Sequence, residues 1–170
     1  MLYSGWDGSG DFFYSMEILY GGIPGRPIGD GMDGHSWWPL FENIPTEYLE
    51  AYYPMRIDGY TTVTDSGGPG FHRGGNGVEK RYVYLEPGEV SIHDDRWLTR
   101  PWGVLGGLPG ARSTKLLKRA DGTEEVLPSK CDNVVVEPGD MLVYRTAGGG
   151  GWKDRLDRPA ELVARDVSFG

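Results

Sequence analysis

Two of the three histidines in this 170-residue sequence stand beside aspartates, and these pairings are the first candidates for chemistry. Asp33 lies two residues before His35, and His93 is followed directly by Asp94 and Asp95. Imidazole nitrogen and carboxylate oxygen atoms are ligands that divalent metal ions accept. None of the spacings is diagnostic of a metal site, however, and such loop residues more often hydrogen-bond the backbone around them. We therefore assign no metal ligand to this chain.

The third histidine lies next to an arginine in the glycine-rich stretch Asp65–Val78, which has six glycines in fourteen residues. Backbone N–H groups in such a loop can form an anion nest, and Arg73 beside His72 could then hold a carboxylate or a phosphate. The stretch is not a P-loop, because it contains no Gly-Lys-Ser/Thr sequence. The alternative is a tight connection in which Arg73 pairs with a neighbouring carboxylate such as Asp65.

Two more glycine clusters, at residues 103–110 and 148–151, repeat the character of this stretch. Glycine adopts left-handed backbone conformations freely and leaves room for a ligand or a second backbone to approach. The three clusters predict loops that a ligand or another backbone contacts closely. We expect neighbouring chains to pack against the glycine-lined edges of these loops. For residues 148–151 the alternative is a backbone crossing packed against Trp152. The candidate interface residues are Gly106, Gly107, Gly149 and Gly150.

Two tryptophans and a single cysteine complete the candidates. Trp37 and Trp38 precede Pro39 and could form an apolar wall for a ring-bearing substrate, or anchor the core or an interface. Cys131 is the only cysteine, so it cannot form a disulfide within the chain. A nucleophilic cysteine usually has a histidine nearby, and no histidine lies near Cys131 in the sequence.

The elements that must position these residues are mostly strands. Apolar and polar residues alternate with a period of two in Met55–Thr64 and Val78–Leu85, as in half-buried strands. Turn sequences spaced about ten residues apart favour a β-sandwich or a barrel-like module. Further strands are expected at 89–93 and in two hairpins, 113–119 with 124–127 and 133–136 with 141–146. The predicted fold class is mainly β (α+β), with glycine-rich loops, one short internal helix and a C-terminal helix.

Two short helices are expected before and after these strands. Thr46 can cap a helix over residues 47–52, which Pro54 must end. Asp157 can cap a second helix over residues 159–167. The apolar face of this second helix would carry Leu162, Val163 and Val167.

The chain is predicted to be a single domain, residues 1–170. Residues 1–54 form a loop-rich, aromatic segment, residues 55–156 the β module, and residues 157–170 the terminal helix. Within the first segment, residues 1–10 have the glycine, serine and aspartate content of a loop. Residues 11–20 are apolar on both faces, which suits a buried strand or a short helix.

Composition and charge exclude several classes of protein. Aromatic residues make up 12% of the chain, more than a disordered protein would have. The net charge is −8, residues 1–50 hold eight acids and one base, and no basic patch indicates nucleic acid as a partner. No apolar run is long enough to span a membrane, and no signal peptide is evident. With its single cysteine, the chain is expected in the cytoplasm.

Several sequence motifs of this chain, in their order along it, resemble those of the hydantoinase B/5-oxoprolinase family. Residues 65–78 resemble its D-S-G-G-x-G-x-x-R-G-G-x-G motif, and residues 101–110 resemble P-x-G-x-x-G-G-x-P-G. The sequence of residues 30–39 resembles the acetone and acetophenone carboxylase branch more than the commoner hydantoinase sequence. The resemblance covers most of this chain but only the C-terminal part of a B-type subunit. Other phrases that match in order are Tyr53–Arg56, Leu127–Lys130, Glu137–Asp140, Thr146–Gly151 and Glu161–Val167.

The resemblance implies a small subunit, a split or processed piece that is inactive alone, in a multi-subunit ATP-dependent carboxylase acting on a ketone. The alternatives are a subunit of an ATP-dependent hydantoinase or oxoprolinase-type cyclic amide hydrolase, and a non-catalytic assembly subunit. A stand-alone β protein that binds a small molecule is a further alternative.

The resemblance also implies partners and cofactors. The partners would be a hydantoinase A-like ATP-binding subunit and the N-terminal portion of a hydantoinase B-like subunit, in a hetero-oligomer that takes a small-molecule substrate. The partners would hold ATP with Mg or Mn, and Zn or another divalent metal, and this chain would hold none of them. The candidates for residues near the substrate are Asp33, His35, Trp38, His72, Arg73, Gly74 and Gly75.

Overall fold

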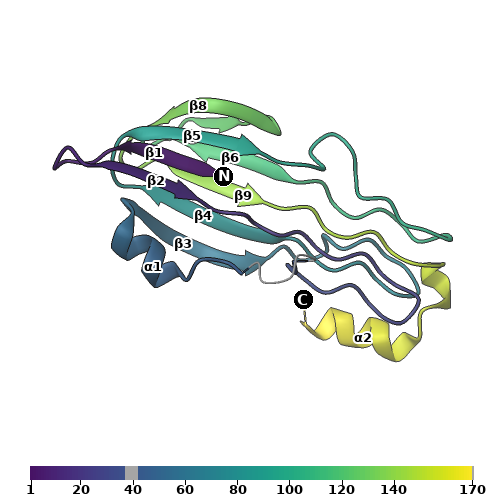
Figure 1. The fold of residues 1–170 in the computed structure, drawn as a ribbon. Helices are drawn as coiled ribbons and strands as arrows, with labels where there is room; N and C mark the ends of the chain where they lie inside the picture. Colours follow the sequence, from purple (N-terminus) through teal and green to yellow (C-terminus); the bar gives the residue numbers. More distant parts are fainter. Residues whose placement is uncertain (37–41, 170) are drawn as a thin grey trace.

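The computed structural model describes residues 1–36 and 42–169, which form two packed antiparallel β-sheets and two helices (Figure 1). One sheet has four strands in the order β2-β1-β5-β8, and the other has five strands in the order β3-β4-β9-β6-β7. The first sheet contains β1 (Leu2–Trp6), β2 (Phe12–Met16), β5 (Gly88–His93) and β8 (Lys130–Val136). The second contains β3 (Met55–Thr62), β4 (Val78–Tyr84), β6 (Thr114–Lys118), β7 (Glu124–Val126) and β9 (Met141–Arg145).

The core lies between the two sheets, which confirms the predicted mainly β sandwich. Tyr3 and Phe13 reach it from the four-stranded sheet, and their rings lie 4.8 Å apart. Tyr82, Leu142 and Leu117 form a row across the five-stranded sheet, because their strands pair at these positions. Removing these side chains from water supplies most of the drive for the two sheets to pack.

The N-terminal residues differ from the sequence prediction. Residues 1–10 were expected to form a loop, but Leu2–Trp6 is strand β1, because Tyr3 is fully buried between the sheets. Residues 11–20 were expected to be buried on both faces. Their strand β2 buries only alternate residues, and Phe12, Tyr14 and Met16 on its other face are more than half exposed.

One of the two predicted hairpins is correct and the other is wrong. Strands β6 and β7 pair as predicted. Strands β8 and β9 do not pair, because β8 pairs with β5 in one sheet and β9 lies between β4 and β6 in the other. The turn Glu137–Asp140 therefore carries the chain from one sheet to the other, and the Asp140 carboxylate accepts a hydrogen bond from the Glu137 N–H (3.1 Å).

Both helices form, but their ends and contacts differ from the prediction. Helix α1 (Thr46–Tyr52) includes Thr46 as its first residue, and no side-chain hydrogen bond caps it. Helix α2 (Ala160–Phe169) follows a 3-10 turn (Arg155–Asp157) whose N-cap is Asp154, and Asp157, predicted as the cap of the helix, is the last residue of that turn. Val163 and Val167 were expected on a packed face and are 44% and 77% exposed. Among the described residues, neither helix is long and apolar enough to cross a membrane.

Two glycine-rich stretches, before the start of β4 and after the end of β9, run side by side as extended segments (Figure 1). The N–H of Gly149 donates to the carbonyl of Gly75 (2.9 Å), and the N–H of Gly25 donates to the carbonyl of Gly150 (2.8 Å). These backbone hydrogen bonds link segments that are far apart in the sequence. We call residues 21–34, 65–77, 101–111 and 147–152 the glycine bundle.

The glycines of this bundle provide space for neighbouring backbone. A Cβ atom on Gly22 would lie 1.8 Å from the Gly75 carbonyl oxygen, and one on Gly150 would lie 1.9 Å from the Trp102 carbonyl oxygen. Real side chains cannot come this close to a backbone oxygen. The predicted close approach therefore exists, but at these glycines the second backbone belongs to the same chain and not to a neighbouring one.

Candidate functional site

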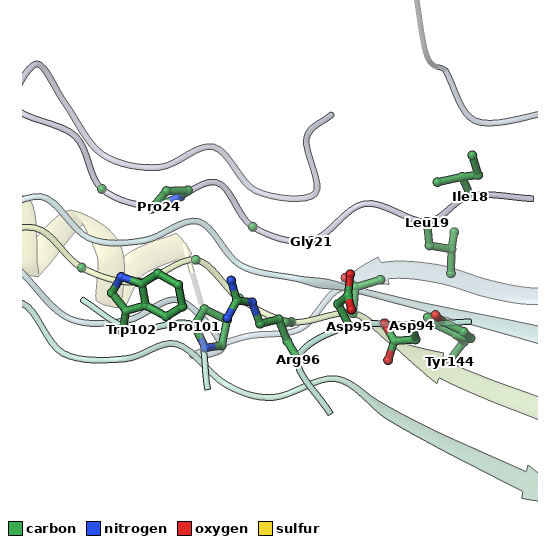
Figure 2. Close-up of a pocket in the computed structure, with 18 of the residues that line it drawn as sticks. Ile18, Leu19, Gly21, Pro24, Asp94, Asp95, Arg96, Pro101, Trp102 and Tyr144 are labelled. Carbon is green, nitrogen blue, oxygen red and sulfur yellow. The ribbon is translucent and has the colours of Figure 1, made fainter. Parts of the chain in front are cut away.

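A cleft of about 610 Å³ opens where the sandwich meets the glycine bundle (Figure 2). Its floor is the segment 147–151. One wall is the segment that follows β2, with Leu19 and Pro24, and the other is the segment that follows β5, from Asp94 to Trp102. A cleft with a few polar groups among apolar ones is the usual form of a small-molecule site.

The polar wall of the cleft consists of three consecutive residues, Asp94, Asp95 and Arg96 (Figure 2). Asp94 is fixed from behind, because its carboxylate accepts hydrogen bonds from the Ser113 hydroxyl (2.5 Å) and from the fully buried Lys115 ammonium. Within the described part of the chain, the carboxylate of Asp95 makes no ion pair or hydrogen bond. The structure thus holds one carboxylate rigidly and leaves the next one available to a ligand.

Arg96 reaches toward the outer part of the cleft from an unusual backbone position. Its φ is +62°, a left-handed conformation that is uncommon for a residue other than glycine. Its guanidinium lies 4.6 Å from the centre of the Trp102 ring, a cation–π contact that orients it. Among the described residues, no carboxylate pairs with Arg96, so its N–H donors remain available.

Two buried lysines, Lys80 and Lys115, pair with the cleft-lining residues Glu17 and Asp94. Strand pairing places Lys80, Tyr144 and Lys115 in one row, next to the apolar row of the core. Lys80 pairs with Glu17 (2.5 Å), and both side chains are 1% exposed. Burial and the nearby Asp94 hold the pKa of Tyr144 well above its usual range, so this phenol remains protonated. Buried ion pairs rarely add to stability, which makes this cluster a candidate for function.

Sequence reasoning missed this cluster, although one signal for it was available. Lys80 occupies an inward position in the predicted strand Val78–Leu85, where alternation with Tyr82 calls for an apolar residue. A charged residue at such a position must have a buried partner. The partner could not be identified, because Glu17 directly follows strand β2 of the other sheet and is 63 residues away.

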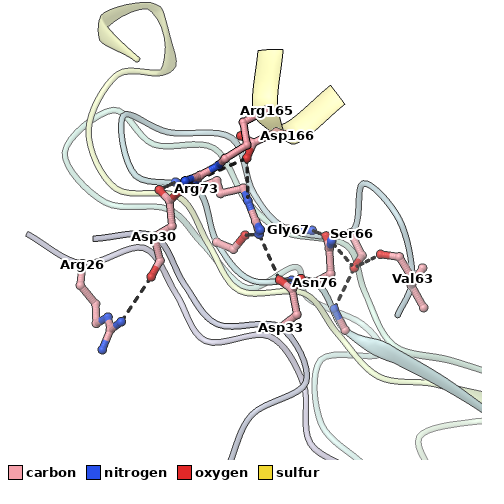
Figure 3. A network of polar contacts seen from close by, with 12 residues as sticks. Arg26, Asp30, Asp33, Val63, Ser66, Gly67, Arg73, Asn76, Arg165 and Asp166 are labelled. Atoms are coloured by element: carbon pink, nitrogen blue, oxygen red, sulfur yellow. Dashed lines mark hydrogen bonds and ion pairs between the residues drawn. The ribbon is translucent and has the colours of Figure 1, made fainter. Parts of the chain in front are cut away.

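Two of the predicted near-substrate residues, Asp33 and Arg73, meet elsewhere, at the junction of the glycine bundle with α2 (Figure 3). Asp33 accepts hydrogen bonds from the Arg73 guanidinium (3.0 Å) and from the Asn76 N–H (2.7 Å). Arg73 also lies 3.5 Å from Asp166 of α2. The alternative in which Arg73 pairs with a carboxylate therefore describes the structure, although the partner is Asp33 and not Asp65. Binding of a substrate by Arg73 remains a prediction.

Asp30 is the centre of this junction. Arg158, whose side chain is 6% exposed, donates two hydrogen bonds of 2.8 Å to the two oxygens of Asp30 and also pairs with Asp166. His72 lies 3.4 Å from the same carboxylate. Burial alone would raise the pKa of Asp30, but the hydrogen bonds and charges of Arg158 and Arg73 outweigh it and hold that pKa below its usual value. We call Asp30, Arg73, Arg158 and Asp166 the α2 clamp.

The remaining candidates do not converge on one site. His35 is exposed, and its N–H donates to the Gly21 carbonyl (3.1 Å). Trp38 lies outside the described residues. The His72 ring stacks on Trp152 at 5.5 Å. Gly74, Gly75, Gly149 and Gly150 are buried within the bundle, whereas Gly106 is exposed and Gly107 is half-buried.

The histidine and aspartate pairs considered as metal ligands do not converge. His93 faces Asp132 (3.0 Å) on the surface, while its sequence neighbour Asp94 turns inward to Lys115. Among the described residues, no group of three or more His, Cys, Asp or Glu side chains is arranged to hold a metal ion.

Comparison with known proteins identifies relatives for most of the chain. The family model described as Hydantoinase B/oxoprolinase matches residues 1–155. The chain is 37% identical to an uncharacterized protein of Methanocaldococcus jannaschii, over 74% of this chain and 22% of that protein. It is 31% identical to a putative D-/L-hydantoinase subunit of the B type from a Pseudomonas species, over 94% of this chain and 27% of that one. It is 30% identical to the beta subunit of caprolactamase from Pseudomonas jessenii, over 92% of this chain and 29% of that one.

Two solved structures share the fold. An ATP-dependent caprolactamase from Pseudomonas jessenii matches 99% of this chain with a TM-score of 0.81 and 26% identity, over 31% of its own length. A nucleotide-free acetone carboxylase structure also matches 99% of this chain with a TM-score of 0.81, over 27% of its length. The sequence identity to acetone carboxylase is 18%, so this second match concerns the fold alone. The chain therefore spans less than a third of each relative described here.

Proposed function

The chain belongs to the hydantoinase B/oxoprolinase family, and on this premise we propose that it forms part of an ATP-dependent enzyme complex that hydrolyses a cyclic amide. Relatives at 30–32% identity are named as a B-type hydantoinase subunit, a 5-oxoprolinase and a caprolactamase beta subunit. Hydantoin, 5-oxoproline and caprolactam each contain an amide within a ring. These names favour a cyclic amide over a ketone as the substrate of this chain's complex.

The observation that carries the proposal is that Asp95 and Arg96, neighbours in the chain and each without an ion-pair partner among the described residues, both line the polar wall of the cleft (Figure 2). An amide held in a small ring is cis, so its N–H and its C=O point to the same side. A carboxylate accepts a hydrogen bond from the N–H, and an adjacent guanidinium donates one to the C=O. Leu19 and Pro24 on the opposite wall would contact the methylene groups of the ring.

The rest of the reaction would depend on partners. We propose that ATP, bound with Mg or Mn by a hydantoinase A-like subunit, phosphorylates the amide oxygen and so activates the carbonyl carbon toward water. The task of this chain is then to orient the amide and to exclude competing water. A divalent metal would also be held by the partners, and we place the complex in the cytoplasm.

Substitution of the two polar-wall residues tests this proposal in the assembled complex. We expect Asp95→Asn and Arg96→Gln each to lower kcat/KM for a cyclic amide by at least about tenfold, because each removes a charge-assisted hydrogen bond. Asp58→Asn, at a partly exposed carboxylate on β3, is the matched control and should leave turnover unchanged. Hydantoin, 5-oxoproline and caprolactam are the substrates to assay with ATP. Unchanged kinetics in both variants, with the complex intact, would support a purely structural assembly subunit.

Carboxylation of a ketone is the second candidate, because the sequence of residues 30–39 resembles the carboxylase branch. The chain also shares its fold with acetone carboxylase. A ketone offers an acceptor oxygen but no N–H donor. In that case Arg96→Gln would lower activity and Asp95→Asn would not. Assays of acetone with bicarbonate and ATP, run beside the amide assays, therefore separate the two candidates through the same variants.

A further inference from the structure

The outer face of strands β1 and β2 is apolar except for Ser4, and it is uncovered among the described residues. Tyr3 and Phe13 point into the core, so their neighbours along each strand point outward. Trp6 is 66% exposed, Phe12 58%, Tyr14 54% and Met16 56%. We call Leu2, Trp6, Phe12, Tyr14 and Met16 the β1–β2 apolar face.

These residues form one ordered surface, since strand pairing sets their positions. Trp6 lies opposite Phe12 with their rings 5.2 Å apart, and Leu2 lies opposite Met16. Ile18, 44% exposed, follows directly in the chain. Isolated exposed apolar side chains are common, but a contiguous aromatic patch usually marks a binding surface.

Strand β2 is also an edge of its sheet. In the order β2-β1-β5-β8, β2 has a strand neighbour on one side only. Soluble proteins normally protect such an edge with charges, with proline or with a covering segment. The exposed side chains of β2 are apolar instead, which indicates that another segment covers this strand in the functional protein.

The charge around the face indicates the character of that segment. The first 25 residues contain no lysine or arginine, and of their three acids Glu17 is buried and paired with Lys80, which leaves Asp7 and Asp11. Asp7 and Asp11 border Trp6 and Phe12 at the far end of the face. The complementary surface is therefore apolar with basic residues at its rim.

We propose that the β1–β2 apolar face is the docking surface for the part of a B-type polypeptide that lies outside the segment matched here. In the caprolactamase structure, this chain's fold accounts for 31% of a longer chain, so most of that chain lies outside the matched segment. In acetone carboxylase the share is 27%. A segment of that size is sufficient to cover the face and to satisfy the β2 edge. This inference rests on family membership and not on the chemistry of the cleft.

Hydroxyl-radical footprinting tests the proposal on the assembly purified from its source, with the purified chain as reference. We expect oxidation of Trp6 and Met16 to fall at least about fivefold in the assembly, because a docked surface excludes solvent from interface cores. Tyr52, 68% exposed on α1, is the internal control and should change by less than about twofold. Equal oxidation of Trp6 and Met16 in both samples would overturn the proposal.

Charge substitutions on the face give an independent readout of assembly. Tyr14→Lys should leave the urea midpoint of the chain unchanged, because the side chain is exposed, and should weaken association with the remaining B-type polypeptide by at least about tenfold. Tyr14→Phe should associate normally, and Tyr52→Lys on α1 is the matched control. Normal association of Tyr14→Lys would contradict the proposal. So would a homodimer of this chain that Tyr14→Lys abolishes, since the occupant would then be a second copy. None of these results depends on turnover, so the docking surface and the amide chemistry can fail separately.

Discussion

The β-sandwich and the glycine bundle are stabilised by different parts of the polypeptide, side chains in the first and backbone in the second. Between the sheets, stability comes from side chains such as Tyr82, Leu117 and Leu142, which fill the space between two backbones. In the glycine bundle, backbones touch one another directly, and the Gly149 N–H donates to the Gly75 carbonyl across the contact. A core of side chains can adjust to a change of volume when side chains change rotamer. Two backbones in direct contact have no side chain between them that could move aside.

This difference explains why glycine is so frequent in the bundle. None of the residues Gly148–Gly151 has a left-handed φ, so these glycines are not required by their backbone conformation. They are required because a Cβ at any of the four would come within 2.2 Å of a carbonyl oxygen, a distance that real Cβ atoms do not show. The cleft floor is built from this segment, so the site depends on the more rigid of the two regions.

The largest effect is expected from a single methyl group in the bundle. Gly150→Ala would place a Cβ 1.9 Å from the carbonyl oxygen of Trp102, and the backbone of two segments would have to separate. We expect a loss of more than about 4 kcal/mol in the free energy of unfolding, or failure to fold. Urea denaturation followed by far-UV circular dichroism measures it.

A matched glycine outside the bundle provides the control. Gly8 has only the flexible Glu86 side chain near the position of a Cβ, at 3.7 Å, so Gly8→Ala should leave the urea midpoint unchanged or slightly raised. A Gly150→Ala protein as stable as Gly8→Ala would mean that the bundle can loosen, and the contrast between the two regions would be lost.

The sandwich core should be more tolerant. Leu142 is 1% exposed, and Leu142→Ala removes buried methyl groups and leaves a cavity, at a cost of about 2–5 kcal/mol. Leu142→Met keeps the volume and should cost less than about 1.5 kcal/mol. Urea midpoints of both variants, measured beside Gly150→Ala, compare the regions directly. Equal losses for Leu142→Met and Leu142→Ala would show that this core is as inflexible as the bundle.

The same contrast explains how much of the fold the sequence could predict. Alternation of apolar and polar residues identified most strands, because a half-buried strand imposes a period of two wherever it lies. It failed for Leu2–Trp6, whose serine and glycine have the composition of a loop, and whose role as a strand depends on pairing with β2 and β5. The glycine stretches were recognised as places of close approach. Their partners could not be predicted, because contact between distant backbones has no side-chain pattern.

The candidate site was harder to predict than the fold. Asp33 and Arg73 were both predicted to lie near the substrate, and their side chains do meet, with Arg73 also close to Asp166 of α2. Their role at a substrate stays a prediction. The cleft was not predicted, because its polar wall and the buried lysines behind it come from different strands that only the tertiary fold brings together. Lys80 and Lys115 on the inward face of their strands were the available signal.

A more local effect is expected at the α2 clamp, where charges rather than packing hold a helix against the bundle. The pKa of Asp30 is lower in the folded chain than its usual value, although burial alone would raise it. The clamp therefore contributes stability that is complete above the unfolded pKa and is lost as pH falls through the folded pKa. Since Val163 and Val167 are exposed, little apolar packing remains to hold α2 once Asp30 is protonated.

We therefore expect α2 to detach in acid while the sandwich stays folded, with a local loss of about 1.5–3 kcal/mol. The amide NMR signals of residues 160–169 should move to unfolded positions between about pH 5 and pH 2. Asp30→Asn should release α2 already at neutral pH and remove this transition. Asp140→Asn, at another carboxylate whose pKa is lowered, should affect the Glu137–Asp140 turn and leave the transition of α2 in place. A helix that stays docked in Asp30→Asn would show that α2 is held by packing after all, and that the bundle and its helix stabilise each other as the two sheets do.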